Sequence, residues 1–143
     1  MNTIEVSLIK LRVEVMALDS ATNELFDSIG TMINSLKAIP DTLKGVDELK
    51  KQSDEIVEIM YDIQSNINLT WGQIETLMTC FKDKSQEESD ELEKQYTDDM
   101  AAVSASTKSI GTKVESLSTK SMNLLPSAMG LLFNAMGGNI DED

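Results

Sequence analysis

The sequence predicts an all-α protein, an elongated antiparallel three-helix bundle or coiled coil that runs up-down-up and carries a short apolar C-terminal helix. Three observations lead to this prediction. Apolar residues recur at alternating steps of three and four over long stretches of the chain. Only two prolines and seven glycines interrupt the 143 residues. The connections between the periodic stretches are short, which favours antiparallel neighbours.

The first helix is expected over about residues 3–38. Asn2 and Glu5 have capping-box spacing, and Pro40 ends the helix because the residue before a proline is pushed out of helical backbone angles. Ile9, Val13, Met16, Phe26 and Ile33 lie beside the main apolar stripe and widen it. A stripe of this width is typical of a helix that contacts two neighbours.

The second helix is expected over about residues 42–82, with apolar residues stepping from Val46 to Phe81. Trp71 flanks this stripe and is directly followed by Gly72. Small secreted helical hairpins of the type VII secretion class instead place one residue between Trp and Gly, at a turn. We therefore interpret Trp71 as a core or interface anchor within a helix.

The third helix is expected over about residues 86–125, after a break at 82–85. Ser85 and Glu88 have capping-box spacing there, and the apolar register changes. A bend within one continuous helix is the alternative at this point. Serine and threonine are frequent between Ala101 and Leu125, so this helix offers less apolar area than the first two. Residues 1–125 would thus form the bundle.

Two short segments follow the bundle. Residues 126–138 are predicted to form a short apolar helix, with Pro126 in its first turn and two glycines at its end. Leu131, Leu132 and Phe133 are its predicted contact residues. The apolar run is shorter than the roughly 20 residues that span a bilayer. Residues 139–143 form an acidic tail.

The composition argues against most catalytic and metal chemistry. The chain has no histidine and one cysteine, Cys80, which we interpret as a packed or partly exposed thiol near a helix end. Acidic residues outnumber basic ones by 25 to 12, for a net charge of −13, which argues against nucleic-acid binding. The acidic clusters lack the spacing of a calcium loop. We expect no catalytic residue, cofactor or metal, and no enzyme.

The function expected from these patterns is that of a helical interaction or scaffold protein, which packs against itself or a partner helix. The predicted core at the middle of the rod is Leu25, Ile29, Met32, Ile56, Met60 and Ile63. The alternative is a membrane-active protein, either a peripheral binder or a toxin component, that uses residues 124–136. Its general layout is similar to that of soluble helical pore-forming toxins. The partner, the oligomeric state and the choice between these uses of the tail stay open.

No secretory signal is visible at the N-terminus, because charged residues interrupt the first apolar run. The expected location is therefore the cytoplasm, or the outside of the cell by a route without a classical signal peptide.

Overall fold

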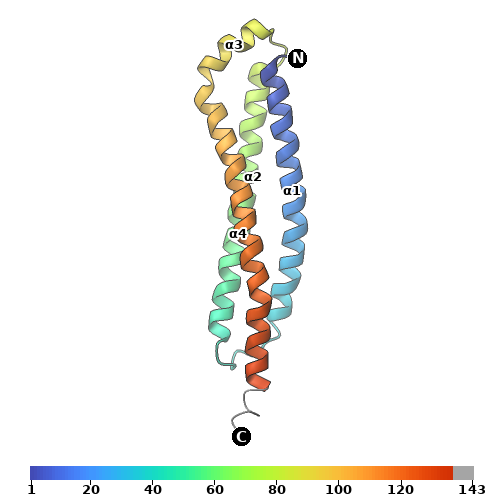
Figure 1. The fold of residues 1–143 in the computed structure, drawn as a ribbon, viewed down its shortest axis with the longest axis vertical. Helices are drawn as coiled ribbons and strands as arrows, with labels where there is room; N and C mark the ends of the chain where they lie inside the picture. The colour runs from blue at the N-terminus through green and yellow to red at the C-terminus, as the bar shows by residue number, and fades with distance from the viewer. Residues whose placement is uncertain (137–143) are drawn as a thin grey trace.

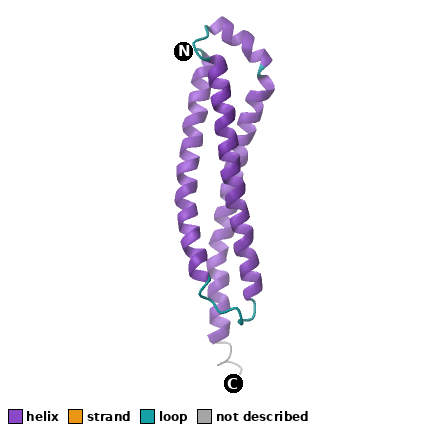
Figure 2. Cartoon of the chain, turned by 180° about the vertical axis from the view of Figure 1, so that it is seen from behind, coloured by secondary structure: helices purple, strands orange, loops and turns teal. Residues whose placement is uncertain are grey.

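The structure is a computed structural model that describes residues 1–136, and the regular elements in this range are all helices. Four helices pack together: α1 (Thr3–Leu36), α2 (Val46–Phe81), α3 (Gln86–Gln95) and α4 (Thr97–Met136). The predicted all-α class is confirmed. Figures 1 and 2 show α1, α2 and α4 side by side along the long axis, with α3 across one end. The predicted acidic tail, 139–143, lies outside the described residues.

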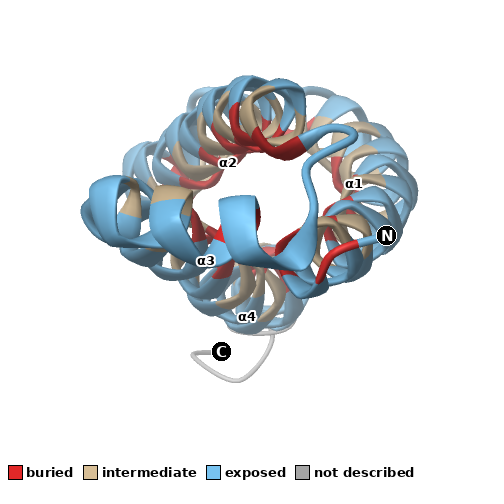
Figure 3. Ribbon diagram, turned by 90° about the horizontal axis from the view of Figure 1, so that it is seen from above, coloured by how far each residue is buried: buried red, intermediate tan, exposed pale blue. Residues whose placement is uncertain are grey.

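The core lies along the axis between α1, α2 and α4, and Figure 3 shows the buried residues on the inward side of these helices. Isoleucine and leucine supply most of it. Each such side chain that leaves water stabilises the fold by roughly 1.5–3 kcal/mol. The most deeply buried apolar residues are Leu8, Val15, Ile56, Ile63, Ile67, Ile74, Phe81, Val103, Ile110, Leu117 and Leu124.

Small polar residues also lie in this core, and two of them are on α4. Thr107 and Ser121 are buried, and their hydroxyls donate to carbonyl oxygens of their own helix, at Val103 and Ser118. The hydrogen bonds satisfy the hydroxyls without a partner on another helix. Small side chains therefore let α4 pack closely against α1 and α2 while contributing little apolar area.

Two polar contacts fix the register between α2 and α4. Asn66 Nδ2 donates to Ser109 Oγ at 3.3 Å, and Lys113 Nζ lies 2.9 Å from Asp62 Oδ2. The residue numbers of both pairs add to 175, so Val46, the first residue of α2, is level with about residue 129. The last turns of α4 therefore extend past α2 and lie beside the connection between α1 and α2 (Figure 1).

Asn2 joins the N-terminus of α1 to the end of α2. Its side chain accepts from the backbone N–H of Glu5 at 2.8 Å, which completes the expected capping box. Its Nδ2 also donates to the carbonyl oxygens of Phe81 and Lys84, each at 3.0 Å. Asn2 is only 3% exposed, and its side chain both caps α1 and binds the last carbonyl of α2 and one carbonyl of the connection that follows.

Replacing Asn2 with alanine is expected to lower the free energy of unfolding by about 2 kcal/mol, the sum of a lost cap and a buried carbonyl left unpaired. Asn2→Ser keeps an acceptor for the cap but lacks the amide donor, so about half of that loss is expected. Urea denaturation followed by circular dichroism measures both. A loss below about 0.5 kcal/mol for Asn2→Ala would show that this corner contributes little.

The connection between α1 and α2 is longer than the sequence predicts. The expected helices end at 38 and begin at 42, whereas α1 ends at Leu36 and α2 begins at Val46. Gly45 precedes α2 with φ of 91°, a left-handed conformation that glycine adopts without strain and that interrupts the helix at this residue. Lys50 pairs with Asp41 in this connection at 2.6 Å, and that hydrogen bond raises the pKa of Lys50.

The expected single helix over 86–125 is wrong, because this part of the chain forms α3 and the first part of α4. The Ser85 capping box at its start is present. The chain then kinks at Tyr96, whose φ of −107° and ψ of 17° depart from helical values. The ring of Tyr96 packs edge-to-face on Phe81, with centroids 5.9 Å apart, at the end of α2. We attribute the kink to this contact, which draws the chain over the end of the bundle.

The expected start of a separate short helix at Pro126 is also wrong. Pro126 lies within α4, which continues to Met136. Its exposed ring faces away from the core, while Leu124 and Ala128 on either side are buried. The same face of the helix packs on the core before and after Pro126. This packing therefore keeps the helix continuous, although proline is unfavourable in the interior of a helix.

Candidate functional site

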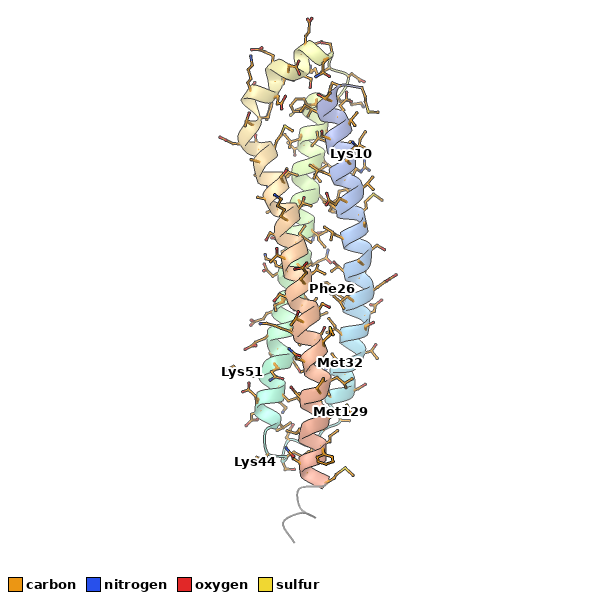
Figure 4. The ribbon with its side chains drawn as sticks, in the orientation of Figure 1. Lys10, Phe26, Met32, Lys44, Lys51 and Met129 are labelled. Carbon is orange, nitrogen blue, oxygen red and sulfur yellow. The ribbon has the colours of Figure 1, made fainter. Side chains whose placement is uncertain are left out.

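The six residues predicted for the middle of the rod all lie in the core or against it. Ile29, Ile56 and Ile63 are buried, and the other three are partly buried and packed on the core. They come from α1 and α2 only, and α4 adds Ile110 and Leu117, which belong to the apolar stripe that the sequence predicts for the third helix. Figure 4 labels two of the α1 side chains near this level, Phe26 and Met32.

Trp71 is partly buried and packs against the core from α2. The guanidinium carbon of Arg12 on α1 lies 5.9 Å from the centroid of its ring, at the outer limit of a cation–π contact. Within the single chain, Trp71 is therefore a bridge between α1 and α2.

Cys80 is partly buried and packs near the kink between α3 and α4. Hydrogen bonding and charge repulsion from Cys80 raise the pKa of Tyr96, with smaller contributions from desolvation and from Asp99. Neither residue faces a histidine, since the chain has none. A histidine-paired thiolate is therefore excluded at Cys80.

Six of the twelve exposed large apolar residues among residues 1–136 form a stripe on the last four turns of α4. We call it the α4 stripe, and its members are Met122, Leu125, Met129, Leu132, Phe133 and Met136. Their spacing of three and four places them on one side of the helix, a face about 100° wide. They are 39–73% exposed. Figure 4 labels Met129 in the middle of the stripe.

The predicted contact residues of the tail thus divide between two faces of α4. Leu131 points inward, where its side chain lies beside Gly45. Leu132 and Phe133 belong to the outward α4 stripe. The sequence indicated an apolar segment but not this division, since large apolar residues cover most of its circumference.

A second, smaller apolar surface lies near the start of α1. Val6, Val13 and Met16 are exposed there, at helical spacing. The sequence interpretation assigned Val13 and Met16 to a stripe that contacts two neighbouring helices, whereas in the single chain these side chains point outward. Charged residues interleave with this patch, including Lys10 and Glu14.

Charge is distributed unevenly along the rod. Residues 83–99, which include α3, carry eight acidic residues against two basic ones. Residues 121–136 carry no charged residue at all. The acidic end and the α4 stripe lie at opposite ends of the molecule (Figure 1). The α4 stripe therefore lies in an uncharged segment at the end of the rod away from the acidic residues.

The described residues include a few open grooves. One, of about 500 Å³ between α2 and α4, is lined by Gly72, Leu77, Tyr96 and Val103, among others. In residues 1–136, no group of histidine, cysteine, aspartate or glutamate side chains is placed to hold a metal ion. Across the same residues, no helix combines the length and apolar character needed to cross a membrane.

Comparison of the chain with protein family models, with curated proteins and with solved structures finds no match.

Proposed function

We propose that this chain is a non-enzymatic helical interaction protein, an up-down-up coiled-coil bundle that packs an apolar helix face against itself or against a partner helix. The observation that carries this proposal is the α4 stripe. Its six large apolar side chains are exposed on one face of a helix, in a segment without charge, on a protein of net charge −13. Apolar patches of this kind mark interaction surfaces.

The spacing of the α4 stripe supports a helix as the occupant. Side chains at three- and four-residue steps fit between the side chains of a second helix packed alongside. Methionine supplies three of the six residues, and its flexible thioether adapts to a partner surface. The acidic remainder of the surface keeps the protein soluble and restricts contact to the uncharged face.

The second candidate is a membrane-active protein that uses the same stripe. Phe133 and Met136 are exposed near one end of the rod, as an inserting surface requires. The net charge of −13 works against it, because anionic lipid repels an acidic protein. We therefore favour the protein partner.

A photo-crosslinking experiment tests the proposal in cells of the organism that encodes the chain. A benzophenone amino acid replaces Met129 in the α4 stripe, and in the control it replaces Glu55, an exposed residue on α2. The expected result is a discrete protein adduct from position 129 and none from position 55, with mass spectrometry identifying the adduct. Adducts to lipid would favour the membrane candidate, and equal labelling at both positions would contradict an interaction face.

A further inference from the structure

We infer that the α4 stripe binds a second copy of this chain, forming an antiparallel dimer centred on Met129. This inference deepens the proposed function and rests on it, since it names the partner as the protein itself. Three observations carry it: the exposed area, the symmetry of the stripe about its middle, and the position of the acidic end.

The exposed area of the stripe matches one side of a stable interface. Its members are 39–73% exposed, and a fully exposed side chain of this size offers roughly 200 Å². The stripe thus exposes on the order of 700 Å², close to the roughly 800 Å² that each partner buries in an interface of standard size.

Five of the six residues of the stripe are placed symmetrically about Met129. A twofold axis at Met129 places Met122 opposite Met136 of the second copy and Leu125 opposite Phe133. Leu132 lies opposite Pro126, whose ring is also exposed. The two stripes then bring exposed apolar side chains together at each of these positions, as a self-complementary interface requires. A second copy of this chain therefore fits the stripe, and no other partner sequence has to be assumed.

The charge distribution favours this antiparallel arrangement over a parallel one. Residues 121–136 are uncharged, so the paired segments themselves bring no like charges together. The acidic segment 83–99 lies at the other end of each rod. In an antiparallel pair joined through the α4 stripes, the two acidic ends point away from each other. A parallel pair would place them side by side, where repulsion between them is strongest.

Sedimentation equilibrium of the purified full-length chain, from micromolar to submillimolar concentration, tests the dimer. The expected mass is twice the 15.8 kDa of one chain. The double variant Met129→Glu, Phe133→Glu is expected to weaken dimerisation roughly a hundredfold or more, because it places charges in the apolar seam. The matched control Val13→Glu, Met16→Glu alters the exposed patch on α1 and is expected to leave the dimer intact. Circular dichroism checks that all variants keep their helices.

Disulfide formation in a Cys80→Ser background tests the orientation. Met129→Cys is expected to crosslink with itself, and a mixture of Met122→Cys with Met136→Cys is expected to crosslink across the seam. Self-crosslinking of Met122→Cys would overturn the antiparallel arrangement.

The remaining outcomes also decide between the inference and the proposed function. A dimer that survives the Glu pair but is lost in the α1 control would place the seam on α1, overturning the inference while supporting the proposed function. A monomer at all concentrations would overturn the inference. The photo-crosslinking experiment at position 129 would then decide between a different protein partner and a membrane. A monomer that floats with phosphatidylcholine vesicles through Phe133 would overturn the inference in favour of the membrane candidate.

Discussion

Replacing Phe81 with alanine is expected to lower the free energy of unfolding by about 3–5 kcal/mol. Phe81 is fully buried at the end of α2 and packs edge-to-face on Tyr96, with 5.9 Å between the ring centroids. Its removal leaves a cavity where α2, the N-terminus of α1 and the kink between α3 and α4 meet. Because single domains are stable by only about 5–15 kcal/mol, this loss is a large share of the total.

Urea denaturation followed by circular dichroism and by Trp71 fluorescence measures this effect. Tyr61→Ala is the matched control, since Tyr61 is 73% exposed on the same helix and its loss is expected to change stability by less than about 0.5 kcal/mol. Adding Tyr96→Ala completes a double-mutant cycle, in which the ring pair is expected to contribute about 0.5–1.5 kcal/mol. A cost for Phe81→Ala near that of Tyr61→Ala would contradict the packing at this end.

Periodicity within one helix predicts much of the core. Ile29, Ile56 and Ile63 were named from their spacing, and they are buried. The capping boxes at Asn2 and Ser85 were predicted for the same reason, since a cap involves residues only three apart and depends on no other helix. These features are local, and a local pattern is sufficient to predict them.

The features that the sequence did not predict depend on contacts between helices. Large apolar residues follow helical spacing on two faces of α4, one containing Leu124 and Leu131 and the other containing Met122 and Met129. The inward face continues the stripe of Val103, Ile110, Leu117 and Leu124 to Ala128 and Leu131, provided that one helix runs through Pro126. That continuity depends on the packing of Leu124 and Ala128 against the neighbouring helices, which the sequence around Pro126 does not reveal. The kink at Tyr96 is similar, because we attribute it to a contact with Phe81 on another helix. The α4 stripe therefore became visible only in three dimensions.

Replacing Pro126 with alanine is expected to raise the free energy of unfolding by about 3 kcal/mol. Pro126 lies in the interior of α4, where it has no N–H to donate to the carbonyl oxygen of Met122 four residues earlier. Its ring is exposed, so alanine removes no core contact. The gain is measured by urea denaturation. Gly130→Ala is the reference variant, because a Cβ at Gly130 meets no other atom. Its gain in the free energy of unfolding is expected to be about 1 kcal/mol.

The sign of this result also bears on the α4 stripe. If a separate helix began at Pro126, its missing N–H would cost nothing, and alanine would be neutral or destabilising. In that case Met122 and Leu125 would belong to a different helix from Met129 and Phe133, and the stripe would not be one face. A clear gain in stability would instead show one helix running through Pro126, and with it the continuous apolar face on which an antiparallel pairing centred on Met129 depends.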